Sequence, residues 1–250
     1  MREISDHGEY LFTSPVSRTT LSSASILFDS AKSFKGKYTM SLQIADTAPN
    51  FTASTTQGDI SFYDYLGDSW GVLFSHPKDF TPVCTTELGA VASLSDEFAK
   101  RNTKVLAVSV DSLGSHKSWV SDIEEVGNVT VDYPIVADED RTVATLYDMI
   151  HPNASDSMTV RSVFVINPDK KVALTLTYPA PVGRNFDEIL RVLDALQLGG
   201  KYKVATPANW KQGEDVIISS AVSDEDANDL FPDGWDAKKP YLRYVKNPAN

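Results

Sequence analysis

Cys84 is the only cysteine of the chain and the residue best suited to covalent chemistry. It ends the stretch Pro77-Lys-Asp-Phe-Thr-Pro-Val-Cys84, between an apolar run at 70–75 and a helix-like run from Thr85 onward. A cysteine at the start of a helix meets unpaired N–H groups and the positive end of the helix dipole, which favour thiolate over thiol. Because the thiolate is the reactive form, the sequence predicts a nucleophilic sulfur. The alternative is a small buried apolar residue, the usual role of a lone cysteine.

The loop before Cys84 has residues that suit a small polar oxygen substrate. Thr81 stands three residues before the cysteine, so its hydroxyl is expected beside the sulfur. Pro77 and Pro82 fix two φ angles and remove two donors, which stiffens the loop. His76, directly before the loop, could supply or relay a proton.

Strands and helices are predicted to alternate around this loop. The valine-rich run 104–110 indicates a central strand that is covered on both faces. Further apolar periods predict helices at 115–126 and 186–196, and a hairpin of strands at 163–166 and 172–178. This order predicts an α/β fold with a mixed central sheet flanked by helices.

Three segments are expected along the chain. Residues 1–38 are rich in Ser and Thr without a period, residues 39–198 have the pattern of a compact domain, and Gly199-Gly200 indicates a boundary. The last segment, 199–250, is too small for a large core of its own, yet it is rich in aromatic residues. These are expected to pack either on the main domain or across a dimer: Trp210, Phe231, Trp235, Tyr241 and Tyr244.

Composition excludes several classes of protein. The net charge is −11 and the pI is about 4.8, which argues against nucleic acid as a partner. No apolar run approaches the roughly 20 residues of a transmembrane helix. One cysteine rules out an internal disulfide and a four-cysteine zinc site, and it suits a reducing compartment.

The four histidines do not have the spacing of metal ligands, and no glycine-rich phosphate loop occurs. We therefore expect no metal and no cofactor. His116 and His151 are expected to be surface or helix-face residues.

Residues 1–38 have features of both a targeting segment and a disordered tail, so two cellular locations are considered. Basic residues interleaved with Ser and Thr are typical of organellar targeting, whereas four acidic residues in the same segment favour a disordered tail. The expectation is a cytoplasmic protein, with organellar targeting by residues 1–38 as the alternative.

The motif from Pro77 to Glu87 resembles the active-site loop of the peroxiredoxins, specifically the 1-Cys class and its peroxiredoxin-6-like subfamily. The resemblance extends over about residues 42–244 and includes Val160-Arg161, Gly183-Arg184-Asn and Ala205-Thr-Pro-Ala-Asn-Trp210. It implies a thioredoxin-like fold with a C-terminal extension that helps to build a homodimer.

The resemblance also implies roles for individual residues. Cys84 would be the peroxidatic cysteine and Arg161 the guanidinium beside its thiolate, although on its own Arg161 would be interpreted as a solvated residue at a strand entrance. The other residues with implied catalytic or supporting roles are Thr81, Pro77, His76, Glu87 and Arg184.

The implied reaction is attack of the Cys84 thiolate on hydrogen peroxide or an organic hydroperoxide, which gives a sulfenic acid. Because no second cysteine can resolve this intermediate, an external thiol of the glutathione or thioredoxin type is expected as the reductant. The alternatives are a redox-regulated chaperone or peroxide-signalling protein with incidental turnover, and an inert thioredoxin-fold module.

Some animal members of this class also hydrolyse phospholipids through a serine, a histidine and an aspartate. Ser69 and Asp169 match two of these residues, but Tyr63 occupies the expected histidine position. A tyrosine of ordinary pKa is a poor base near neutral pH, so phospholipase activity is expected to be weak or absent.

Overall fold

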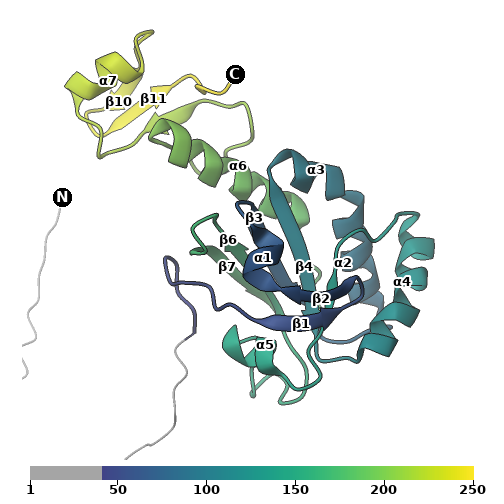
Figure 1. The fold of residues 1–250 in the computed structure, drawn as a ribbon. Helices are drawn as coiled ribbons and strands as arrows, with labels where there is room; N and C mark the ends of the chain where they lie inside the picture. Colours follow the sequence, from purple (N-terminus) through teal and green to yellow (C-terminus); the bar gives the residue numbers. More distant parts are fainter. Residues whose placement is uncertain (1–40) are drawn as a thin grey trace, which may run out of the picture. The chain divides into compact units, whose positions relative to one another are not determined.

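A seven-stranded mixed sheet is the centre of the fold in the computed structural model, which describes residues 41–250 (Figure 1). The predictions for residues 1–38 lie outside the described residues. The strand order is β2-β1-β5-β4-β3-β6-β7. The strands are β1 (Thr52–Thr55), β2 (Gly58–Ser61), β3 (Trp70–Ser75), β4 (Thr103–Ser109), β5 (Ile135–Ala137), β6 (Arg161–Ile166) and β7 (Val172–Tyr178).

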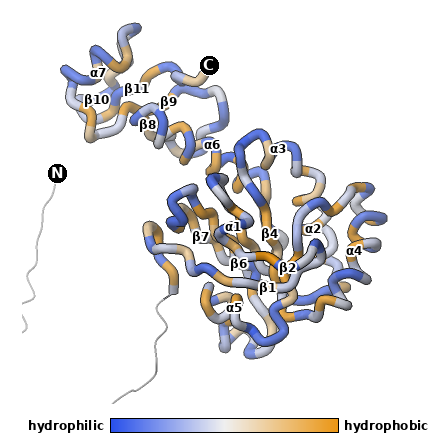
Figure 2. The backbone as a smooth tube through the Cα atoms, viewed as in Figure 1, coloured by the Kyte–Doolittle hydropathy of each residue, from blue (hydrophilic) through white to orange (hydrophobic). Residues whose placement is uncertain are grey.

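The three central strands, β4, β3 and β6, hold the buried apolar runs. β4 runs parallel to β3 and β5, whereas β6 lies antiparallel to β3 and β7. The hydrophobic colour of β4 in Figure 2 reflects its valine-rich sequence. β-branched residues fit a pleated surface that is covered on both sides, so this run forms a central strand.

Successive residues of these strands enter two separate hydrophobic cores, one on each face of the sheet. In β3, for example, Phe74 belongs to one core and Leu73 to the other. Helices α2 (Pro82–Ser93), α4 (Leu113–Gly127) and the first part of α6 (Phe186–Tyr202) supply side chains to the Phe74 core. Helices α1 (Phe62–Leu66) and α5 (Thr142–Leu146) cover the Leu73 core. The short α3 (Ser95–Lys100) follows α2.

The predicted α/β class and mixed sheet are confirmed. The helix predicted at 186–196 is longer than expected. Its predicted end was wrong, because α6 continues through Gly199-Gly200 to Tyr202. Neither glycine has a positive φ, and Asn185 caps the start of the helix by accepting a hydrogen bond from the Glu188 amide at 3.3 Å. The amphipathic pattern therefore outweighs two weak helix formers.

The C-terminal segment has a sheet and a small core of its own. Its strands follow the order β10-β11-β9-β8. These elements are β8 (Val204–Ala205), β9 (Val216–Ile218), α7 (Asp224–Leu230), β10 (Asp236–Lys239) and β11 (Leu242–Val245). Trp210 and Phe231 are buried in a cluster that also contains Leu198 of α6. Of the two expected arrangements, packing on the main domain is met in part, because Ala195 and Leu198 at the end of the 39–198 segment contribute to this cluster. The other members come from 199–250, so the segment also has a local core.

No helix among the described residues is both long and apolar enough to span a bilayer.

Candidate active site

Cys84 lies in the first turn of α2 and is fully buried. The helix begins at Pro82, a residue favoured at the first helical position because its missing N–H needs no partner there. The first backbone bond of the helix runs from the Thr85 amide to the Thr81 carbonyl at 3.0 Å. The amide of Cys84 therefore precedes the regular helical bonds, and the sulfur lies at the positive end of the helix dipole.

Arg161, the first residue of β6, reaches this sulfur from the strand next to β3. Its Nη1 donates to Sγ of Cys84 at 3.3 Å. The Nε and Nη2 groups both donate to the carbonyl of Ala180, at 2.9 and 2.7 Å. Because these two bonds fix the plane of the guanidinium, Nη1 is directed at the sulfur.

Glu87, one turn after Cys84, joins Arg161 to a second buried arginine. Its Oε2 accepts from Nη1 of Arg161 at 2.6 Å and from Nη2 of Arg184 at 2.7 Å, and its Oε1 accepts from Nε and the amide of Arg184. Nη1 of Arg184 donates to the Ser75 carbonyl at 2.8 Å, which ties the cluster to the end of β3.

This cluster carries a surplus of one positive charge. Burial raises the pKa of Glu87, but the hydrogen bonds and charge of Arg184, together with the charge of Arg161, outweigh burial and hold that pKa below its usual range. Two guanidiniums and one carboxylate therefore face a buried sulfur, an arrangement that stabilises the thiolate.

Two other predicted residues, Pro77 and Thr81, lie in the loop before α2. Pro77 is buried, whereas Thr81 is half-buried. The Thr81 hydroxyl donates to the Lys78 carbonyl at 2.8 Å, and no bond between it and Cys84 occurs among residues 41–250. Its expected place beside the sulfur, and its contact with a peroxide, remain predictions.

His76 belongs to a buried polar cluster that the sequence did not predict. Its Nε2 lies 2.9 Å from Oδ1 of Asp79, while Nδ1 of His116 lies 2.7 Å from Oδ2 of the same carboxylate. His116 was expected at the surface or on a helix face; it lies on the buried face of α4, so the surface alternative was wrong. The pairing joins residues 37 positions apart, so no local spacing indicated it.

Among the described residues, these same three side chains form a group that could hold a metal ion. Their potential ligand atoms lie within 4.8 Å of one another. Sequence spacing had given no sign of this grouping. Both imidazole–carboxylate distances are those of ordinary hydrogen bonds, so we assign the cluster to hydrogen bonding.

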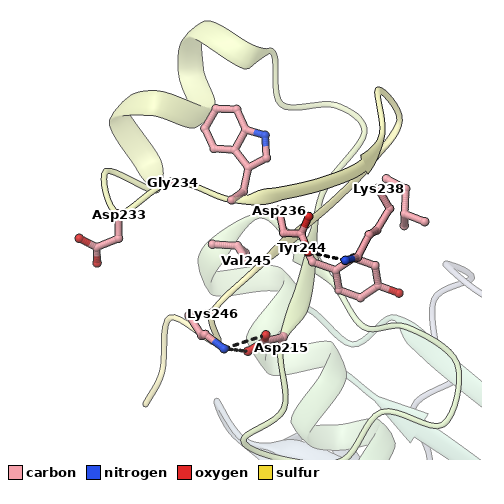
Figure 3. A pocket seen from close by; sticks show the side chains of 10 residues that line it. Asp215, Asp233, Gly234, Asp236, Lys238, Tyr244, Val245 and Lys246 are labelled. Atoms are coloured by element: carbon pink, nitrogen blue, oxygen red, sulfur yellow. Dashed lines mark hydrogen bonds and ion pairs between the residues drawn. The ribbon is translucent and has the colours of Figure 1, made fainter.

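A hollow of about 840 Å³ lies in the C-terminal segment (Figure 3). Trp235 and Tyr244 line it, together with the ion pair of Lys246 and Asp215 at 3.0 Å. None of its lining residues belongs to the Cys84 cluster.

The residues at the positions of the phospholipase pattern do not bond to one another. Ser69 donates its hydroxyl to Oδ1 of Asn102 at 3.0 Å, and the Tyr63 hydroxyl donates to the Ala48 carbonyl at 2.5 Å. Asp169 is exposed. Weak or absent lipid hydrolysis stays a prediction. Calcium-independent hydrolysis by pure protein that is lost in Ser69→Ala would contradict it.

Two family models match the chain. The AhpC/TSA family matches residues 44–175, which include Cys84, Glu87 and Arg161. The C-terminal domain of 1-Cys peroxiredoxin matches residues 195–234.

Individual relatives give the same result. The chain is 56% identical to the 1-Cys peroxiredoxin of Dictyostelium discoideum, over 83% of this chain and 86% of the relative. It is 51% identical to Peroxiredoxin-6 of Gallus gallus, over 83% and 98%. A solved structure of the yeast mitochondrial 1-Cys peroxiredoxin, described as showing thiol resolving via glutathione/thioredoxin systems, matches with a TM-score of 0.78 and 54% identity, covering 82% of this chain and 99% of that one.

Proposed function

The chain belongs to the AhpC/TSA family and, within it, to the 1-Cys peroxiredoxins, and from this premise we propose that Cys84 is its peroxidatic cysteine. The protein is a thiol peroxidase with a thioredoxin-like fold. The observation that carries the assignment is the 3.3 Å bond from Arg161 to the sulfur of Cys84, buried at a helix start.

In the proposed reaction the Cys84 thiolate attacks the terminal oxygen of a peroxide. The new S–O bond forms as the O–O bond breaks, and the sulfur supplies the two electrons. The leaving oxygen takes up one proton and departs as water or an alcohol. The guanidinium of Arg161 stabilises the negative charge that moves from sulfur to oxygen.

Supporting roles are proposed for the residues around this pair. Glu87 holds Arg161 and Arg184 in place, since one carboxylate bonds both guanidiniums. Thr81 and Pro77 are proposed to shape the peroxide site, and His76, directly before the loop, is proposed to handle a proton.

The substrates are hydrogen peroxide and organic hydroperoxides, and the reductant is an external thiol of the glutathione or thioredoxin type. The thiol attacks the sulfenic sulfur, releases water and forms a mixed disulfide, which a second thiol then cleaves. The described thiol-resolving route of the similar yeast protein supports this proposal.

Stopped-flow mixing without reductant tests the role of Cys84. The wild type should consume about one equivalent of peroxide per chain within seconds and then stop, because each sulfur reacts once. Cys84→Ser should show no such burst. A slow reaction that persists in Cys84→Ser would overturn the proposal.

We also propose a homodimer built with the help of the C-terminal segment, 199–250, next to a peroxidase domain of 39–198. Exposed Tyr241 and Leu230 give this segment apolar surface that a second copy can cover. Sedimentation should give twice the chain mass, and Tyr241→Asp combined with Leu230→Asp should lower it. A monomeric wild type would contradict the proposal.

Cytoplasmic residence is the proposed location. A fluorescent fusion of the full chain should stay diffuse in the cytoplasm. A mitochondrial signal that disappears when residues 1–38 are deleted would establish the alternative, for which the mitochondrial location of the similar yeast protein is a precedent.

A further inference from the structure

The buried face of α4 carries a histidine whose two ring nitrogens both have partners. Nδ1 of His116 lies 2.7 Å from Oδ2 of Asp79, and Nε2 lies 3.1 Å from the carbonyl of Val136 on β5. The ring is completely inaccessible to solvent. Water therefore cannot replace Asp79 or the Val136 carbonyl as the hydrogen-bond partner of the ring.

Both partners of His116 can only accept hydrogen bonds. A backbone carbonyl has no proton to give. Burial raises the pKa of Asp79, but its hydrogen bonds with His116 and His76 outweigh burial and hold that pKa well below the usual range, so the carboxylate is ionised. Its Oδ2 also accepts from the Ser115 hydroxyl at 2.7 Å. Both ring nitrogens of His116 must then donate, which requires the imidazolium form.

The second imidazole on this carboxylate is in a different state. Nε2 of His76 lies 2.9 Å from Oδ1 of Asp79, and since Asp79 is ionised, this nitrogen donates. Burial lowers the pKa of His76 and outweighs the hydrogen bond and charge of Asp79, which raise it; the charge of His116 adds to the lowering, so the ring is neutral near pH 7. Nδ1 of His76 consequently carries no hydrogen and can only accept a hydrogen bond. It is the one buried side-chain nitrogen or oxygen among residues 41–250 without a hydrogen-bond partner.

We propose that His116 is a positioning residue for the peroxidase reaction. As a buried imidazolium it holds the Asp79 carboxylate, which fixes His76 in the Nε2–H tautomer and leaves Nδ1 free to accept a proton or a hydrogen bond next to the 77–84 loop. The inference rests on the proposed role of Cys84. It means that a residue of α4 helps to position the active site.

Asp79 is a suitable link because it belongs to the loop that leads to Cys84. Its amide donates to Oδ2 of Asp111 at 3.0 Å, so both its backbone and its side chain are held. The next residue, Phe80, has a φ of 55°, in the left-handed region that non-glycine residues seldom adopt. Trp119, one turn after His116, packs on His76 with 5.2 Å between ring centroids. The α4 face thus supports the loop conformation at several points.

The charges near the His116–Asp79 pair set the expected effect of losing it. The loop contributes Asp79, the segment after β4 contributes Asp111, the end of β3 contributes His76, and β5 contributes only the carbonyl of Val136. Without the imidazolium, the acidic charges would have no cation beside them. His76 would then bind a second proton more readily and lose its free Nδ1.

Nitrogen-15 NMR of the wild type with labelled histidine tests the protonation states without any measurement of activity. We expect one histidine with both nitrogens protonated near pH 7 and one fixed in the Nε2–H tautomer, assigned through His116→Gln and His76→Gln. A neutral His116 near pH 7, or a His76 that exchanges between tautomers, would overturn the inference.

The pH dependence of the reductant-free peroxide burst tests the consequence for the reaction. In His116→Gln the acid limb of the rate profile should move to higher pH by about one unit or more, whereas His151→Gln, a matched change at a half-buried loop histidine, should leave it in place. A uniform loss of rate with an unmoved limb would indicate a purely structural role and overturn the inference.

The two measurements separate the possible failures. If the wild type shows no burst, the proposed role of Cys84 fails, and NMR still reports the state of His116. If His116→Gln does not fold, His76→Gln alone completes the assignment, because the fully protonated histidine that remains is then distinguished from half-buried His151 and from His7 by the slow exchange of its buried ring protons with water.

Discussion

The guanidinium of Arg161 is held so that one of its nitrogens is left for the sulfur. Nε and Nη2 are bonded to the Ala180 carbonyl, while Nη1 bonds both Glu87 and Cys84. A lysine has a single charged nitrogen and cannot make these contacts together.

Arg161→Lys is therefore expected to slow the reductant-free peroxide burst by a factor on the order of 10², the usual effect of removing one preorganised donor. Stopped-flow Trp fluorescence measures this rate. Arg141→Lys, at an exposed arginine outside the cluster, is the matched control and should react at the wild-type rate. A wild-type rate in Arg161→Lys would mean that charge alone suffices.

Glu87→Gln should destabilise the fold. The carboxylate is 3% exposed and neutralises two buried guanidiniums, so its loss leaves buried positive charge without a counterion. Breaking such an ion pair costs about 3–5 kcal/mol of unfolding free energy. Urea unfolding measures the change. Glu97→Gln, which removes a carboxylate paired with Lys100 and Arg101 at the surface, is the control and should have a much smaller effect.

The sequence predicted this arginine–glutamate cluster only through its resemblance to a family. From the residues alone, its side-chain partners could not be identified, since the bonds of Arg161 to Cys84 and Glu87 span 77 and 74 residues. The Asp79–His116 pair was missed for the same reason. Its only local signal was a histidine on the apolar stripe that contains Trp119 and Ile123, and burial of a polar ring there depends on a partner that the stripe does not reveal.

At the scale of elements, periodicity predicted which segments form the sheet but not where helices end. The run around β4 could only be a strand that is buried on both faces. By contrast, Gly199-Gly200 suggested a break, although its surroundings favour a helix. Helix propensity is a weak tendency that packing overrides, and the C-terminal core holds α6 on both sides of the two glycines, since Leu198 is buried in it and Tyr202 packs against it.

The two glycines of α6 give a matched pair of predictions. A Cβ added at Gly200 has nothing within 4 Å, so Gly200→Ala should stabilise the protein by about 0.5–1 kcal/mol through a smaller entropy loss on folding. A Cβ at Gly199 would lie 3.0 Å from the Val204 carbonyl, which is backbone and cannot easily move. Gly199→Ala should therefore give no gain or a loss. Equal stabilisation in thermal unfolding would contradict this account.

Across the whole molecule, two separate apolar regions support the described chain: the pair of cores around the main sheet and the small core of the C-terminal segment. The aromatic residues of that segment were expected to pack either on the main domain or across a dimer. Trp210 instead satisfies its indole N–H by donating to the Glu214 carbonyl at 3.0 Å, which allows its ring to be buried locally. Tyr241 is 78% exposed, so part of the aromatic surface is still available to a second copy.

The stability of the whole molecule should fall in acid because of its buried carboxylates. The pKa values of Asp79 and Glu87 are both lowered in the folded state, although burial alone would raise them, because histidine and arginine partners outweigh it. In the unfolded chain such groups bind protons near pH 4. The unfolded state therefore binds more protons as the pH falls, and the stability that is present above about pH 4.5 is lost as the pH falls toward the folded pKa values.

Each such group adds a slope of up to about 1.4 kcal/mol per pH unit to the unfolding free energy between roughly pH 3 and 4. Asp138 has the opposite effect on the acid dependence of stability, since burial raises its pKa, but this single group is outweighed by Asp79 and Glu87 together. Urea unfolding at several pH values should thus give a smaller acid slope for Glu87→Gln than for the wild type. Equal slopes would mean that Glu87 does not hold its charge through its arginine partners, because the loss of a carboxylate with a lowered pKa must remove its share of the proton uptake.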